Sequence, residues 1–220
     1  MKKFFGGVLS LLLGYGVMLG LGSLAYQGLG KLNTKVAEWT SPAGYHPTPA
    51  TPDFSRYPIF SPNFEPGPGS ETWKIIEKGG GKYGVSPNII KAILQIETGF
   101  GRNQGQTNAW DYFQAEGDRE NLEALQKIAS ELGIEPHGIR GSYKGCIGIP
   151  QFIPRNWLKF GVDGDADGKV DLFRSMPDAV HSVANYLVQH GYREDWEQSL
   201  WFYNWDRSYV ASVKQLAGTK

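Results

Sequence analysis

The amino-acid sequence predicts an all-α domain at residues 70–220, preceded by a hydrophobic segment at 1–30 and a proline-rich linker at 31–69. Apolar residues after position 70 recur at helical spacing, in segments that begin or end at recognisable signals. The same part of the sequence contains no convincing pair of alternating strands joined by a turn. Because about 150 residues suffice for one core, we expect a single helical domain with a functional cleft between lobes.

Six helices are predicted in this domain. Ser86 and Pro87 are typical of a helix start, and Gly133 and Gly191 are typical of a helix end. Between such signals the apolar residues fall on one helical face. The predicted helices span residues 71–82, 87–96, 119–132, 154–160, 177–190 and 207–216.

The composition argues against a nucleic-acid-binding protein. The 220 residues carry 22 lysines and arginines and 22 aspartates and glutamates, so the net charge is zero. Nucleic-acid-binding domains usually show an excess of positive charge. Because Cys146 is the single cysteine, an internal disulfide is excluded.

The first 30 residues predict export. Lys2 and Lys3 precede an uncharged run at residues 4–25, and about 20 apolar residues can span a bilayer as a helix. The run is either an inner-membrane anchor, with the domain in the periplasm or outside the membrane, or a signal peptide cleaved near Ala25. We favour the anchor because the run exceeds the roughly 7–15 residues of a usual signal core.

The linker is defined by its prolines. Eight prolines lie between residues 40 and 69, where no apolar periodicity is present. Proline keeps such a chain extended at roughly 3 Å per residue, so the linker can hold the domain on the order of 90 Å from a membrane.

Glu97 is the candidate catalytic residue. It lies just after the second predicted helix, four residues after Ile93 and seven after Ile90, so it shares their inward face. Burial and the negative end of the helix dipole both disfavour a charged carboxylate, and both should raise its pKa. A protonated glutamate can donate a proton to a leaving group. The alternative is an exposed glutamate before an ordinary glycine stop.

A loop rich in aspartate predicts a calcium site. Its spacing matches an EF-hand loop, with oxygen ligands at positions one, three, five and nine, a glycine at six and a backbone carbonyl at seven. Position twelve is Arg174, so we expect a later aspartate to supply the closing ligand. Calcium here would be structural, because no histidine accompanies the oxygen ligands; the alternative is an acidic loop without metal. The predicted ligands are Asp163, Asp165, Asp167, Lys169, Asp171 and Asp178.

Residues 141–154, GSYKGCIGIPQFIP, resemble the glycine-rich loop of lytic transglycosylases, and the lytic murein transglycosylase B family in particular. The resemblance continues through Trp157 and the aspartate loop to Tyr203, Asn204 and Tyr209, and it covers about residues 75–218. It implies a lysozyme-like fold.

The resemblance also implies residue roles. Glu97 matches the catalytic acid/base of the family. Ser142 and Gln151 match cleft residues that bind sugar, and Tyr203 and Asn204 match a pair that reaches into the cleft near the glutamate. The aspartate loop matches the calcium site of the family, including its late aspartate.

The implied reaction needs one carboxyl group rather than the usual pair. Asp111 and Glu116 are the available second acids, but their spacing does not tie them to Glu97. In a lytic transglycosylase, Glu97 would protonate the β-1,4 bond between N-acetylmuramic acid and N-acetylglucosamine. It would then deprotonate the muramic C6 hydroxyl, which closes on C1 to give a 1,6-anhydro end.

The expected partners are peptidoglycan glycan strands and, through the N-terminal segment, a membrane. No organic cofactor is expected, and cell-envelope machinery is a further possible partner. Two other functions stay open at this point. A hydrolase of the goose-lysozyme type shares the single glutamate but releases a reducing end, and a non-catalytic protein would only bind glycan.

Overall fold

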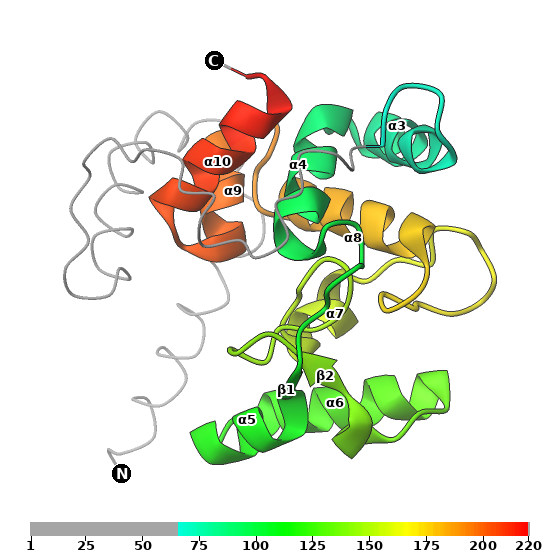
Figure 1. Ribbon diagram of the computed structural model, residues 1–220, viewed down its shortest axis with the longest axis vertical. Helices are drawn as coiled ribbons and strands as arrows, with labels where there is room; N and C mark the ends of the chain where they lie inside the picture. The colour runs from blue at the N-terminus through cyan, green and yellow to red at the C-terminus, as the bar shows by residue number, and fades with distance from the viewer. Residues whose placement is uncertain (1–65, 220) are drawn as a thin grey trace, which may run out of the picture. The chain divides into compact units, whose positions relative to one another are not determined.

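The six predicted helices are present in the computed structural model, which describes residues 66–219 (Figure 1). The predicted membrane segment and nearly all of the predicted linker lie outside these residues. Within residues 66–219, no helix has the length and apolar character needed to cross a membrane. The elements in order are α3 (Glu71–Tyr83), α4 (Pro87–Thr98), β1 (Thr107–Asn108), α5 (Ala109–Glu116), α6 (Arg119–Leu132), the 3-10 turn η2 (Pro136–Gly138), β2 (Arg140–Gly141), α7 (Pro154–Phe160), α8 (Met176–Gln189), α9 (Trp196–Asn204) and α10 (Arg207–Ala217).

Local signals set most helix boundaries within one or two residues of the prediction. The Ser70 side chain accepts a hydrogen bond from the Trp73 amide at the start of α3. Helix α6 ends at Gly133, which adopts the left-handed conformation. The end of α4 differs from the prediction, because the helix continues through Thr98 and stops at Gly99. Glu97 therefore belongs to the last turn of α4.

Helices α5 and α9 were not predicted. Helix α5 buries only Ala109 and Phe113, and α9 buries only Ser199 and Leu200. Such short helices show too few buried positions for a clear apolar period.

The expectation of no strand pairs was wrong at one place. β1 and β2 form a two-residue antiparallel ladder that pairs Thr107 with Gly141 and Asn108 with Arg140. Strands of two residues show no alternation, and about thirty residues separate them, so the sequence carries no signal for this pairing.

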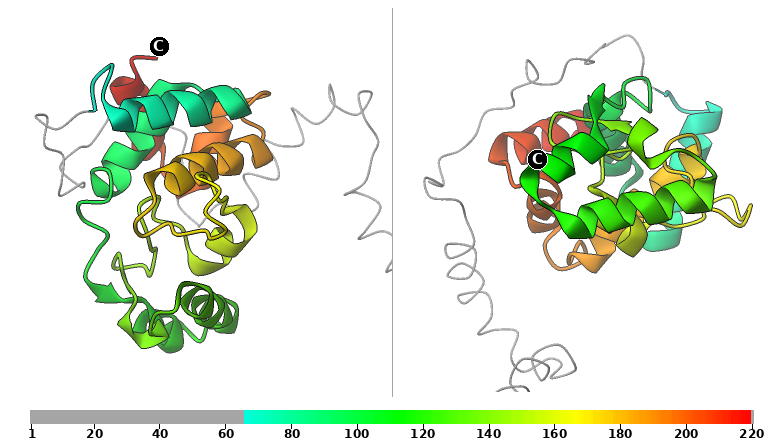
Figure 2. Two further views of the ribbon diagram at one scale, coloured as in Figure 1. Left: turned by 90° about the vertical axis from the view of Figure 1, so that its right-hand side faces the viewer. Right: turned by 90° about the horizontal axis from the view of Figure 1, so that it is seen from below.

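The helices form two groups. Figure 1 shows α3, α4, α8, α9 and α10 at one end and α5, α6 and the β1–β2 ladder at the other, with α7 between them. The side view in Figure 2 shows the same separation. Helix α8 packs on α3, α4, α7 and α9, α4 also packs on α10, and α7 packs on α6. Helix α7 therefore links the two lobes.

The core confirms the predicted inward faces of the long helices. Fully buried side chains line α4, α8 and α6 and belong to one continuous cluster. The large side chains buried most deeply on these helices are Ile90, Ile93, Leu94, Val180, Val183, Leu187, Leu125 and Ile128.

Candidate active site

Glu97 is half-buried in the last turn of α4. Burial raises the pKa of its carboxyl group to about 8 from an ordinary 4.5, and a hydrogen bond with the Tyr209 side chain lowers it in part. Burial disfavours the carboxylate because water no longer solvates the charge. A carboxyl group with this pKa is mostly protonated at neutral pH, which is the state that a general acid requires.

Two further side chains respond to the charge of Glu97. Burial, and after it the negative charge of Glu97, raises the pKa of Tyr203 well above its ordinary value. Burial, and after it the same charge, raises the pKa of the Cys146 thiol to about 11. Because such effects fall off with distance, Tyr203, Tyr209 and Cys146 lie near Glu97. At neutral pH the Tyr203 hydroxyl and the Cys146 thiol keep their protons.

The loop at residues 147–152 is held against α4 from two sides. The Thr98 hydroxyl donates a hydrogen bond of 2.8 Å to the carbonyl oxygen of Ile149. The Tyr203 hydroxyl donates one of 2.7 Å to the carbonyl oxygen of Pro150. On the far side, the Ile149 amide donates to the Leu172 carbonyl oxygen at 2.7 Å. Thr98, which follows Glu97 in the chain, and Tyr203, which lies near Glu97, thus hold the same loop in place.

Gly148 permits this close approach. Its φ is +75°, and a Cβ atom added there would lie 2.8 Å from the carbonyl oxygen of Leu172. Any other residue would combine backbone strain with a steric clash. The Gly148 in the sequence motif is therefore required by packing.

The four predicted sugar-binding residues take different places. Ser142 is half-buried, and its hydroxyl oxygen accepts hydrogen bonds from the amide of Cys146 at 3.2 Å and from that of Lys144 at 3.3 Å. The side-chain amide nitrogen of Gln151 donates to the carbonyl oxygens of Gly148 at 2.9 Å and Gln104 at 3.2 Å. These two side chains shape the loops next to Glu97.

Tyr203 lies near Glu97, and Asn204 follows it as the last residue of α9. Tyr203 is half-buried, whereas Asn204 is exposed. The roles of these side chains in binding sugar stay predictions.

Three of the four non-glycine residues with positive φ within residues 66–219 belong to segments near this site, and the fourth, Ala166, lies in the aspartate loop. Phe100, Gln151 and Trp205 adopt positive φ angles of 61°, 52° and 46°. Phe100 follows Glu97 by three residues, and Trp205 follows Asn204 directly. A non-glycine residue in this conformation costs on the order of 1 kcal/mol or more and persists where its surroundings enforce it. Such strain is frequent at functional sites.

No second acid accompanies Glu97 in the described part of the chain. Burial and Tyr209 account for its pKa shift, and no aspartate or glutamate contributes. Asp111 and Glu116 are exposed on α5. The site therefore offers one carboxyl group, surrounded by hydroxyl groups and a thiol.

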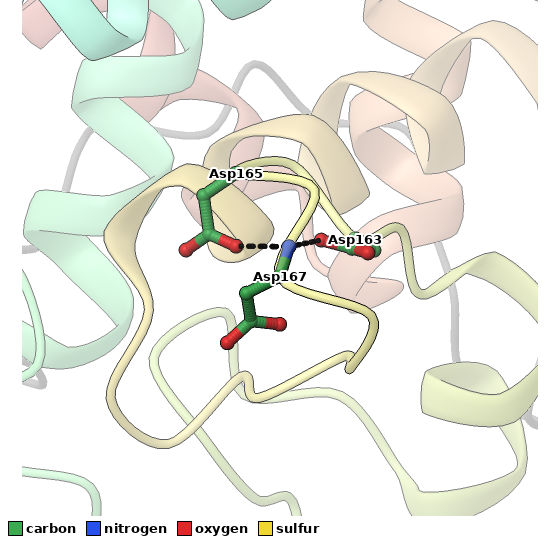
Figure 3. Close-up of side chains that lie close together, drawn as sticks. All are labelled: Asp163, Asp165 and Asp167. Atoms are coloured by element: carbon green, nitrogen blue, oxygen red, sulfur yellow. Dashed lines mark hydrogen bonds between the residues drawn. The ribbon is translucent and has the colours of Figure 1, made fainter.

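Three aspartates of the predicted metal loop converge (Figure 3). One carboxylate oxygen each of Asp163, Asp165 and Asp167 lies within 4.8 Å of the others. The Asp167 amide donates to Asp163 at 3.1 Å and to Asp165 at 3.3 Å, and the Lys169 amide donates to Asp167 at 2.9 Å. These bonds fold the loop so that three hard oxygen donors face one point, which fits a calcium ion.

Asp171 and Asp178 do not join this cluster. The buried Asp178 carboxylate accepts from the Gly164 amide at 2.8 Å and from the Asp171 amide at 2.7 Å, so it ties the two ends of the loop together. Asp171 accepts from the Phe173 amide at 3.0 Å and lies 3.5 Å from Arg174. The structure gathers three of the predicted ligands, and the remaining assignments stay predictions.

Comparison with known proteins decides the family. A family model described as a transglycosylase SLT domain matches residues 70–215. The chain belongs to the transglycosylase SLT family.

The SLT domain has a curated relative in Escherichia coli. Its sequence is 34% identical over 119 residues to the membrane-bound lytic murein transglycosylase B of strain K12, covering 50% of this chain and 33% of that protein. The matched part therefore spans about a third of the length of the relative.

Two solved structures confirm the predicted lysozyme-like transglycosylase fold. The first is the Escherichia coli lytic transglycosylase Slt35 in complex with calcium, with a TM-score of 0.63 and 18% identity, covering 95% of this chain and 89% of that one. The second is SltB3 from Pseudomonas aeruginosa in complex with NAG-anhNAM-pentapeptide, with a TM-score of 0.58 and 19% identity, covering 89% and 79%.

Sequence reasoning assigned no individual role to three residues that shape this SLT domain. Tyr209 carries no spacing signal that ties it to Glu97, because α4 and α10 meet only through packing. Thr98 reads as part of a helix stop, although its hydroxyl holds the facing loop. Ser175 lies just after the predicted metal loop, at the start of α8, and its hydroxyl donates to Asp165 at 2.8 Å.

Proposed function

We propose that this SLT domain is a peptidoglycan lytic transglycosylase with Glu97 as its general acid and base. One observation carries the proposal: a single half-buried carboxyl group whose pKa is raised to about 8. Membership of the SLT family and the name of the Escherichia coli relative support the substrate.

The raised pKa suits the first step. The protonated Glu97 carboxyl group donates its proton to the glycosidic oxygen between N-acetylmuramic acid and N-acetylglucosamine. The bond between that oxygen and muramic C1 breaks, and the N-acetylglucosamine end leaves as an alcohol. Positive charge develops at C1, while Glu97 becomes a carboxylate beside it.

The absence of a second acid among the described residues suits the next step. The Glu97 carboxylate removes the proton from the muramic C6 hydroxyl, and that oxygen bonds to C1. Glu97 regains its proton, no water is consumed, and the new end is a 1,6-anhydro sugar. The solved SltB3 complex contains a ligand with this anhydro unit, which supports the same product here.

The surrounding groups position the reaction without taking its protons. Tyr209 hydrogen-bonds with Glu97 and, in the carboxylate state, stabilises it. Ser142, Gln151 and Asn204 are the proposed contacts to sugar. The fixed loop at residues 147–152 holds one wall of the site against Glu97, which favours a constant distance between acid and substrate.

Product analysis tests this function. The full chain is incubated with purified peptidoglycan, and the released fragments are weighed by mass spectrometry. We expect anhydro products, each lighter by one water than the corresponding reducing-end sugar. The Glu97→Gln variant should bind peptidoglycan but release no fragments. Reducing-end products would identify a hydrolase instead, and undiminished cleavage by Glu97→Gln would remove Glu97 from the mechanism.

We also propose that the loop at residues 163–171 binds a structural calcium ion. The carboxylates of Asp163, Asp165 and Asp167 would hold it, because three neighbouring negative charges repel one another without a cation. The Lys169 carbonyl, Asp171 and Asp178 are the further proposed ligands. The calcium complex of Slt35 supports this choice of metal. When bound, the ion would neutralise the loop.

The proposed place of action is the cell envelope. The substrate lies outside the inner membrane, and the Escherichia coli relative is a membrane-bound protein by name. The apolar run at residues 4–25 supports anchoring of this chain to the inner membrane.

A further inference from the structure

Tyr143 is the most exposed of the large hydrophobic side chains that lie at the surface of residues 66–219. Its exposed fraction is 73%, against 49% for Trp205 and 37% for Leu158. A single exposed apolar side chain is common and by itself indicates nothing. Tyr143 differs from Leu158 because it stands on a rigid turn that runs directly into the Glu97 site.

The turn at residues 142–146 is closed by its own hydrogen bonds. The Ser142 amide donates to the Cys146 carbonyl oxygen at 2.8 Å, and the Gly145 amide donates to the Ser142 carbonyl oxygen at 2.9 Å. The Ser142 hydroxyl oxygen accepts from the amides of Lys144 and Cys146. Four bonds across five residues fix the position from which the Tyr143 side chain extends.

Both flanks of this turn are anchored. A Cβ atom at Gly145 would lie 2.6 Å from the Tyr112 ring and 2.7 Å from the Phe113 ring, so the turn lies directly on α5. At the other flank, the turn continues directly into the loop at residues 147–152, which the Thr98 hydroxyl and the Tyr203 hydroxyl hold next to Glu97. The turn therefore spans from α5 to the candidate active site.

Lys144 adds a positive charge at the same place. Its ammonium group lies over the Tyr143 ring, 5.5 Å from the centroid. The Lys144 side chain is also near enough to Cys146 to lower its pKa slightly against the larger effect of burial. None of the ion pairs among residues 66–219 includes Lys144. An exposed ring and a cation without an acidic partner thus lie side by side at the rim of the site.

We propose that Tyr143 and Lys144 form a rim subsite for peptide-bearing glycan, in which the Tyr143 ring stacks on a sugar ring and Lys144 pairs with a peptide carboxylate. This inference rests on the proposed function. The face of an aromatic ring is negative, and the C–H bonds of a pyranose face carry partial positive charge, so stacking is favourable. The contact also covers the apolar surface of Tyr143.

The two side chains contribute differently. An ion pair at an exposed position contributes little to affinity, because water screens it. We therefore expect Tyr143 to provide most of the binding, and Lys144 to favour glycan that carries peptide over glycan without peptide.

Direct binding tests the subsite. The full-length Glu97→Gln variant is titrated with soluble glycan strands that either carry pentapeptide or have been freed of peptide. Adding Tyr143→Ala should weaken binding of both substrates by about two- to tenfold, the range that aromatic contacts provide. Adding Lys144→Met should weaken binding of the peptide-bearing strands only, and Lys144→Arg should restore it. Leu158→Ala, an exposed apolar residue on α7, is the matched control and should change neither affinity.

Thermal unfolding of each variant verifies that it is folded. Unchanged affinity after Tyr143→Ala, or equal weakening of both substrates after Lys144→Met, would overturn the subsite. If the wild-type chain nevertheless releases anhydro fragments, the proposed function stands without it. If the wild-type chain releases no fragments and the Glu97→Gln variant binds no glycan, the proposed function fails and the subsite fails with it.

Discussion

The rings of Tyr203 and Tyr209 lie parallel, with centroids 6.1 Å apart and 5° between their planes. Tyr203 comes from α9 and Tyr209 from α10, and both side chains lie near the Glu97 carboxyl group. The turn between the two helices therefore positions both the Tyr203 ring and the Tyr209 hydroxyl group that hydrogen-bonds with Glu97. The two tyrosines are not equivalent, because only Tyr203 holds the loop at Pro150.

Activity should depend on pH through Glu97. The raised pKa of about 8 means that the carboxyl group holds its proton below this pH and loses it above. If Glu97 is the acid, kcat/KM should fall as the pH rises through about 8.

The substitution Tyr209→Phe should move this fall in kcat/KM to higher pH. The hydrogen bond from Tyr209 favours the charged carboxylate and lowers the pKa of Glu97, so its loss should raise that pKa further above 8. The measurement is kcat/KM between pH 6 and 10. Tyr83→Phe on α3 is the control, and in this variant kcat/KM should fall at the same pH as in the wild type. A downward shift in Tyr209→Phe would contradict the assigned hydrogen bond.

Thr98→Val should destabilise the domain. The buried Thr98 hydroxyl donates to the Ile149 carbonyl oxygen at 2.8 Å and accepts from the Gly101 amide at 2.9 Å. Valine has a similar shape but leaves both backbone groups without this partner, which costs about 1–3 kcal/mol for a buried group. Urea unfolding measures the loss, and Thr98→Ser should recover most of it. Equal stability of Thr98→Val and wild type would show that the loop is held by other contacts.

Removal of calcium should lower the melting temperature. An ion that binds only the folded state adds stability that depends on its concentration, and the three converging aspartates would repel one another once it leaves. The measurement is thermal unfolding in calcium and in a chelator. Asp163→Asn combined with Asp167→Asn should abolish the difference, whereas Asp111→Asn on α5 should preserve it. The same melting temperature under both conditions would support an acidic loop without metal.

The long helices could be predicted from the sequence because their signals are local. Helix α6 begins at Asp118, whose side chain accepts from the Asn121 amide, and ends at Gly133. Its apolar residues face one side, so both its boundaries and its buried face follow from fourteen consecutive positions. Helix α9 shows the limit, because polar Ser199 and apolar Leu200 are both fully buried. Its burial depends on neighbours that no local pattern reveals.

The candidate site divides in the same way. A helical period of 3.6 residues places Glu97 on the buried face of α4, and alternate spacing places Asp163, Asp165 and Asp167 around one turn, so short-range geometry suffices for these four residues. Asp178 has the same chemistry, but its oxygens bind the amides of Gly164 and Asp171. These two hydrogen bonds of Asp178 depend on how the loop packs on α8, which the sequence does not show.

The spacing of residues in the sequence was thus sufficient to predict the helical class, the single candidate acid and the acidic loop, because each depends on residues a few positions apart. The raised pKa of Glu97 depends on something else. It requires α9, α10 and the loop at residues 141–152 to exclude water from the end of α4, although these segments are distant in the chain. Desolvation depends on everything that surrounds a group in space, so the pKa of Glu97 and the partners that tune it were decided by packing between distant segments.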